Sequence, residues 1–278
     1  MFSERDPAVE LGDPLSRDDM FNRAVDRLTT ATPSPGGDAR VTNLLAVLRG
    51  RALLNLGQFS QAGAAVTAVP TNFVYEFVHG NPPARQNNQI FQQNANDIYS
   101  VPSQEGTNGL NFATAADPRV PVSTPRPSRN DGVTTQVYFL KYTSLADPVN
   151  MVTGIEARLI EAEAELQPGG NTNTWLNKLN EARATVTALG NLSDPGTAAA
   201  RVDLTFRERA FWMFLTGHRI GDLRRLVRQY GRAEESVYPT GAYHKQGLTR
   251  GGQAALRVPQ PEENNSKYVE ANCTQEIP

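Results

Sequence analysis

Aromatic and amide side chains are interleaved between residues 71 and 147 of this chain. The aromatic members are Phe73, Tyr75, Phe77, Tyr99 and Phe112, and the polar members are Asn87, Asn88, Asn108, Asn111 and Arg119. A sugar ring has apolar faces edged by hydroxyl groups, so exposed rings beside hydrogen-bonding side chains suit a glycan. We predict that the ligand-contacting residues are Tyr75, Tyr99, Asn108, Asn111, Phe112 and Arg119.

Side chains that would catalyse bond chemistry are not grouped in this sequence. The three histidines lack the spacing of zinc ligands and are far apart: His79, His218 and His244. Acidic residues alternate along one expected helix and therefore point in different directions: Glu161, Glu163 and Glu165. We expect no enzyme activity, no metal site and no cofactor, although the sequence leaves open whether carboxylates of the 71–147 segment hold calcium.

The charge balance excludes one class of partner. Lys and Arg number 27 against 29 Asp and Glu, for a net charge of −2, so the chain lacks the basic excess that nucleic-acid binding uses. No stretch approaches the roughly 18 apolar residues of a membrane-spanning helix, and the first residues do not resemble a signal peptide. Cys273 is the single cysteine, and we expect it to be a buried apolar residue without a chemical role.

Helical stripes dominate the first 70 residues. A capping box at Ser16 and Asp19 predicts a helix over 17–31, and apolar spacing predicts two more over 39–56 and 59–69. The last two match a tetratricopeptide (TPR) hairpin through small and apolar residues at its offsets: Gly50, Leu53, Gly57, Ala62 and Val66. The fold class is therefore predicted as mostly α, with TPR-like helical hairpins.

The remaining chain divides into a long insert, further helices and a tail. Residues 71–147 read as an irregular ligand-binding insert with short strands at 73–78, 89–91 and 136–140, folded against the helices. Helices should resume at Asp147-Pro148 and continue through 166, 176–189, 204–215 and 220–230. We predict one domain made of TPR-like helices (1–70), the insert (71–147), helical hairpins (148–257) and a C-terminal tail (258–278).

Two adjacent expected helices carry aromatic residues that predict core packing and charged residues that predict ion pairs. The broad apolar arc of Phe211, Trp212, Phe214 and Leu215 should be buried. Arg219 and Asp222 are three residues apart and can meet, and with Arg209 they favour an ion-pair network between two helices over a catalytic site. A basic edge reads as a solvated face: Arg224, Arg225, Arg228 and Arg232.

The same two helices, read with the segment Val258-Pro-Gln-Pro-Glu-Glu-Asn-Asn265, resemble the signature of SusD/RagB-like nutrient-binding lipoproteins. The matched positions are Arg209, Gly217, Arg219, Asp222, Leu223, Pro259, Pro261 and Asn265. Thr216 departs from the pattern, because an acidic residue usually precedes the glycine in that family. The resemblance implies that these positions are structural and that the chain corresponds to the C-terminal part of such a protein.

What the resemblance implies about function is binding without catalysis. The family pattern points to a surface-exposed protein of the cell outer membrane that passes an oligosaccharide or other nutrient to a SusC-like TonB-dependent transporter. Its lipid anchor would lie upstream of Met1. Two alternatives stay open: a cytoplasmic TPR-type adaptor that binds a protein partner, and a glycoside hydrolase, which would need two carboxyl groups across a cleft.

Overall fold

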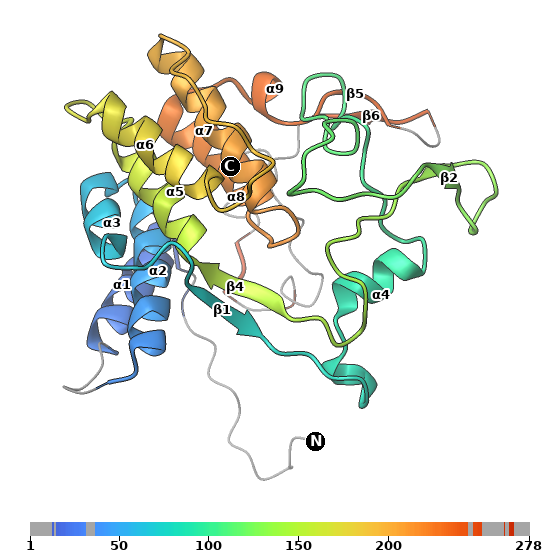
Figure 1. Cartoon of the computed structure of the whole chain (residues 1–278), viewed down its shortest axis with the longest axis horizontal. Helices are drawn as coiled ribbons and strands as arrows, with labels where there is room; N and C mark the ends of the chain where they lie inside the picture. Colours follow the sequence, from blue (N-terminus) through green and yellow to red (C-terminus); the bar gives the residue numbers. More distant parts are fainter. Residues whose placement is uncertain are drawn as a thin grey trace.

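The computed structural model describes residues 13, 15–31, 37–243, 247–251, 264 and 267–269. Antiparallel helices occupy one side of the molecule, and the irregular insert occupies the other (Figure 1). Strands are short and lie in two-stranded pairs, so no central sheet organises the described part of the chain. This is the mostly helical architecture with a long irregular insert that the sequence predicts. Within the described residues, no helix combines the length and apolar character that crossing a bilayer requires.

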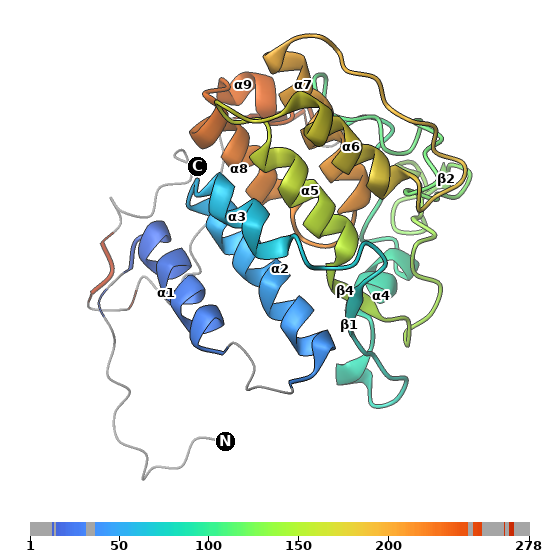
Figure 2. The same cartoon turned by 60° about the vertical axis from the view of Figure 1, so that its left-hand side comes forward.

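The first three helices confirm the stripes read from the sequence. They are α1 (Arg17–Thr30), α2 (Ala39–Asn55) and α3 (Phe59–Val66). Ser16 and Asp19 form the expected capping box at the start of α1. Gly57 takes a φ of 74° between α2 and α3, a left-handed conformation that glycine adopts without steric cost. Helix α1 packs along α2 at the edge of the helical side (Figure 2), and none of its residues is fully buried.

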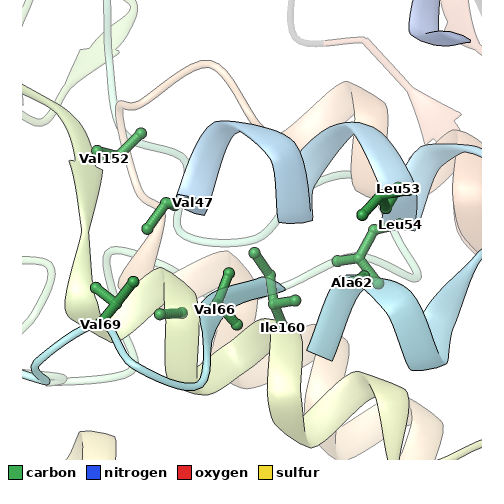
Figure 3. Close-up of a cluster of buried hydrophobic side chains, with 9 residues drawn as sticks. Val47, Leu53, Leu54, Ala62, Val66, Val69, Val152 and Ile160 are labelled. Atoms are coloured by element: carbon green, nitrogen blue, oxygen red, sulfur yellow. The ribbon is translucent and has the colours of Figure 1, made fainter. Parts of the chain in front are cut away.

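Four later helices complete the helical side of the molecule. They are α5 (Gly154–Ala164), α6 (Thr172–Arg183), α7 (Ala198–Trp212) and α8 (Arg219–Tyr230). Helix α5 is central, because it contacts α3, α6 and α7. The largest cluster of buried side chains joins α2, α3 and α5 through residues such as Val47, Val66 and Ile160 (Figure 3). Phe211 is fully buried as predicted, and Trp212, Phe214 and Leu215 are half-buried.

The chain enters and leaves the insert through one antiparallel strand pair, β1 (Val74–Phe77) with β4 (Val149–Thr153). The prediction that a helix begins at Asp147-Pro148 is wrong, because residues 149–153 form β4. Pairing with β1 supplies this β-branched segment with its hydrogen bonds. The Thr153 side chain then accepts a hydrogen bond from the Glu156 backbone N–H and starts α5.

Inside the insert, one expected strand is a helix and another is nearly absent. Residues 89–91 belong to α4 (Gln89–Ala95), which follows the 3₁₀ turn η1 (Ala84–Gln86) and is capped by the Asn88 side chain. The strand expected over 136–140 is reduced to two short pairings. One is β3 (Thr135–Gln136) with β2 (Arg126–Pro127), and the other is a bridge between Val122 and Phe139.

The insert has an apolar cluster of its own that also includes helix α7. Val101, Phe112, Val120 and Phe139 are buried together with Phe211 of α7. The expectation that this long segment folds against the helices is confirmed. Beyond α8 lie the short helix α9 (Glu234–Val237) and the strand pair β5 (Gly241–Ala242) with β6 (Thr249–Arg250).

A close backbone contact at the start of α5 yields a stability prediction. A Cβ atom on Gly154 would lie 1.9 Å from the Pro70 carbonyl oxygen and 2.6 Å from that of Thr71, whereas one on Gly221 of α8 would meet nothing within 4 Å. We expect Gly154→Ala to lower the free energy of unfolding by roughly 1–3 kcal/mol. The matched control Gly221→Ala should raise it by up to about 1 kcal/mol, because alanine favours helix. Urea denaturation measures both, and equal effects of the two changes would contradict the close contact.

Candidate functional site

A hollow of about 690 Å³ opens in the insert between β1, η1, α4 and the start of β4. Its apolar wall includes Phe77, Val78 and Ile90, and its polar wall includes His79, Arg85 and an unbroken run of amides over 86–89. Phe77 ends β1, and the amide run links η1 to α4. The strand pair and the capped helix therefore bring an aromatic ring and several amides to one opening.

Hydrogen bonds of Asn88 fix the shape of this hollow. Its side-chain nitrogen donates to the Asp147 carbonyl at 2.9 Å, and its side-chain oxygen accepts from the Phe91 N–H at 3.0 Å. Its backbone N–H donates to the Leu145 carbonyl at 2.7 Å. Asn88 is fully buried, so it ties α4 to the chain that leads into β4. It is a positioning residue for the wall rather than a free ligand contact.

Asn87 and Phe77 supply the groups that a polar ring would need. Asn87 is 7% exposed, and its side-chain oxygen is buried without a hydrogen-bond partner. A buried acceptor in this state costs free energy that a ligand hydroxyl would recover. The Phe77 side chain is 53% exposed, although an aromatic ring gains free energy from leaving water. Together they suit a molecule with hydroxyl groups and an apolar face.

The two tyrosines that the sequence nominated lie outside this lining. Tyr75 is half-buried against the α2–α3–α5 core, with the Arg40 guanidinium 4.7 Å from its ring centre. Tyr99 is 48% exposed. A ligand contact at either ring stays a prediction, and the more exposed Tyr99 is the better platform of the two.

Asp97 organises the backbone around Tyr99. Its carboxylate is fully buried and accepts hydrogen bonds from Arg126, the Arg129 backbone N–H and the Tyr138 hydroxyl. Burial alone raises the pKa of Asp97, but the hydrogen bonds from Arg129 and Arg126 lower the pKa to about 2. An ionised carboxylate at neutral pH therefore holds this part of the insert to the β2–β3 turn.

Three of the remaining nominated side chains have structural roles. The Asn108 side-chain nitrogen donates to the carbonyls of Glu235 and Tyr238, both at 2.9 Å. Phe112 is 5% exposed and packs 5.1 Å from the Phe211 ring centre, so the prediction that it is a ligand platform is wrong. The insert needs an apolar interior of its own, and Phe112 fills it.

Arg119 joins the insert to the helices. Its guanidinium donates to Asp117 at 2.7 Å and to Glu208 of α7 at 2.6 Å, and its side chain is 4% exposed. The prediction that Arg119 contacts a ligand is therefore wrong, because neighbouring carboxylates engage its donors. Asn111 is half-buried, and its role in ligand binding stays a prediction.

Two of the signature positions, Arg209 and Asp222, belong to a buried ion network between α5, α7 and α8. Arg209 of α7 donates to both carboxylate oxygens of Asp222, at 3.1 and 3.0 Å. Arg225 donates to Asp222 at 2.8 Å and to Glu163 of α5 at 3.0 Å, and the Tyr230 hydroxyl donates to Glu163 at 2.9 Å. The expected pairing of α7 with α8 is present through Arg209 and Asp222, but the network lacks Arg219. It includes instead Arg225, which is 2% exposed and not on a solvated edge as the sequence suggested.

Other signature positions have different partners from those expected. Arg219 does not pair with Asp222. Its guanidinium donates instead to both carboxylate oxygens of Glu105 in the insert, with Nε 3.2 Å from Oε1. Gly217 takes a φ of 80° in the turn between α7 and α8, which explains a glycine there. Leu223 is buried with Val237 and Tyr238. Pro259, Pro261 and Asn265 lie outside the described residues, as do His244 and Cys273.

Three residues that the sequence does not predict as ligand contacts complete the site. Phe77, Gln86 and Gln89 all line the hollow. The alternation along 73–78 and the run Gln86-Asn-Asn-Gln89 are the signals that pointed there. Among the described residues, no group of three or more His, Cys, Asp or Glu side chains is arranged to hold a metal ion.

Comparison with known proteins supports the fold. No family model matches this chain, and no curated protein sequence matches it. Its structure is similar to that of a SusD superfamily protein from Bacteroides vulgatus, with 15% sequence identity and a TM-score of 0.50. The match covers 80% of this chain and 60% of that protein, so this chain spans less than two-thirds of its length. The described chain thus has a SusD-like fold.

The ion network predicts that one acidic residue of α5 is far more important than its neighbour. Glu163 is fully buried against Arg225, whereas Glu165 is half-buried and accepts a hydrogen bond from the Asn171 N–H that an amide oxygen can also accept. We expect Glu163→Gln to lower the free energy of unfolding by about 3–5 kcal/mol, because the buried guanidinium groups of Arg209 and Arg225 would then share only the Asp222 carboxylate. Glu165→Gln should change it by less than about 0.5 kcal/mol. Comparable losses in urea denaturation would argue against the network.

A second buried pair predicts how stability depends on pH. Burial raises the pKa of Glu156, but the Arg51 guanidinium, 2.7 Å away, lowers the pKa to about 2. A carboxyl with a lowered pKa stabilises the fold fully above its ordinary pKa and loses that contribution as pH falls toward the folded value. The urea midpoint should therefore decrease between about pH 4.5 and 2. Glu156→Gln should make this decrease shallower, and an unchanged pH profile would contradict the assignment.

Proposed function

We propose that this chain is a nutrient-binding protein of the SusD/RagB type that binds a glycan without catalysing a reaction on it. The hollow beside Phe77 carries the proposal, because it combines an exposed aromatic ring with the unpaired Asn87 oxygen and an amide run. The SusD-like fold supports the same class. A neutral oligosaccharide fits this lining, with a sugar face on Phe77 and hydroxyl groups on the amides.

The absence of acids from the hollow favours binding over hydrolysis. The described residues that line it include no Asp or Glu, whereas glycoside hydrolysis requires a pair of carboxyl groups roughly 5–9 Å apart. The long insert also differs from a run of uninterrupted TPR repeats, which the adaptor alternative would need. These observations support the carbohydrate-binding proposal over the two alternatives.

The wider biological setting belongs to the same proposal. A protein of this class would be surface-exposed at the cell outer membrane and would pass its glycan to a SusC-like TonB-dependent transporter. Its membrane association would depend on an N-terminal lipid anchor. The match to a SusD superfamily structure supports this setting through the fold alone.

Substitution of single rings tests where the glycan binds. We expect Phe77→Ala to weaken binding of a neutral oligosaccharide about tenfold or more, because the stacking platform is lost. Val133→Ala removes an 84%-exposed side chain elsewhere in the insert and should leave the affinity unchanged. Isothermal titration calorimetry, after a screen of neutral oligosaccharides identifies a ligand, measures each variant.

The same assay includes Tyr75→Ala and Tyr99→Ala. Loss of affinity with Tyr99→Ala and not with Phe77→Ala would place the glycan at Tyr99 and reject the hollow. If no neutral oligosaccharide binds the parent protein, the carbohydrate-binding proposal itself is rejected.

A further inference from the structure

A second hollow, of about 350 Å³, lies where α7, α8 and α9 meet the 108–110 turn of the insert. Figure 1 shows α9 above the α7–α8 pair, at the upper edge of the molecule. We propose that this hollow binds a monoanionic ligand, namely a carboxylate attached to a ring that has an apolar face. The proposal concerns a different surface from the hollow beside Phe77 and does not depend on glycan binding there.

The floor of the second hollow is apolar. Phe206 of α7, Leu223 of α8 and Val237 of α9 line it and are 3%, 7% and 8% exposed. The Arg225 guanidinium carbon lies 5.2 Å from the Phe206 ring centre, and Arg225 belongs to the buried ion network. The floor therefore adjoins the buried ion pairs of the helices, and it presents hydrocarbon to a ligand.

Three arginines surround this floor, and their charges are only partly compensated. Arg219 is paired with Glu105, and Arg232 with Asp203 at 2.7 Å. Arg207 is exposed and lines the hollow, and among the described residues it has no carboxylate partner; its guanidinium carbon lies 4.8 Å from the Phe211 ring centre. Among these described side chains, three guanidinium groups against two carboxylates leave one positive charge. That excess matches a single negative charge on a ligand.

The part of the wall that Asn108 contributes is held in place before any ligand arrives. Besides its two donated bonds to Glu235 and Tyr238, the Asn108 side-chain oxygen accepts from the Thr240 N–H at 2.9 Å. All three bonds join the insert to the segment around α9. A preformed wall reduces the entropy cost of binding. Asn108 is thus a positioning residue of this hollow.

Size and chemistry together define the ligand. A hollow of about 350 Å³ is at the small end of ligand pockets, which suits one ring and not an extended chain. The ring face would cover Phe206 and Leu223, and the carboxylate would accept charge-assisted hydrogen bonds from Arg207. An acidic sugar residue and a small free carboxylic acid share this chemistry.

Two pairs of probes test the charge requirement on the full chain. Galacturonate is compared with galactose, and cyclohexanecarboxylate with cyclohexylmethanol, by isothermal titration calorimetry at low salt. We expect at least one acid to bind, and its neutral counterpart to bind at least about tenfold more weakly. Binding of galacturonate alone would identify an acidic sugar as the ligand class, and binding of cyclohexanecarboxylate alone would identify a small free acid. If neither acid binds, or if acid and neutral probes bind equally, the proposal is wrong.

Matched variants locate the binding. Arg207→Gln should weaken acid binding roughly ten- to a hundredfold, because it removes the uncompensated charge. Arg27→Gln removes the charge of another exposed arginine, on α1, and should leave acid binding unchanged. Ser236→Phe fills the hollow without altering its charge and should abolish binding. Thermal denaturation confirms that each variant is folded, and undiminished acid binding by Arg207→Gln would overturn the assignment.

Discussion

Buried charges must be compensated by one another, and this constraint fixes the helical frame of the molecule. Glu163, Asp222, Arg209 and Arg225 come from α5, α7 and α8, and none of their side chains is more than 6% exposed. Each carboxylate would be costly alone in this environment, and each guanidinium would be equally costly. Their mutual hydrogen bonds set how the three helices lie against one another.

The insert depends on the same frame. Arg119 reaches Glu208 of α7, Arg219 of α8 reaches Glu105, and Phe112 packs on Phe211. These contacts connect an irregular segment of many turns to helices that are already fixed, so its shape is defined with little regular secondary structure. The β1–β4 pair closes the segment at its base. Both hollows lie at joins between the insert and more regular elements, where loop backbone and rigid helix or strand meet.

The two hollows differ in their electrostatics. The one beside Phe77 is lined by amides, one histidine and one arginine, and suits hydroxyl groups. The one beside Arg207 has an apolar floor and a cation that has no carboxylate partner in the part of the chain that the structure describes, and this lining suits a carboxylate. A protein with both could bind a glycan that carries neutral and acidic sugars, because each hollow recognises a different part of such a molecule.

Periodicity along the sequence determined the helices α1, α2, α3 and α8, because their apolar stripes and caps are local properties. The interleaved rings and amides of the insert predict a sugar ligand, and both the ligand and the residues that contact it stay predictions. The sequence predicts Phe112 and Arg119 as ligand contacts, but in the folded chain Phe112 packs against Phe211 and Arg119 pairs with Glu208. The sequence predicts that a helix begins just before Val149–Thr153, but this segment pairs with β1 and forms a strand. Tertiary structure decided these cases, since burial and pairing depend on residues far away in the chain.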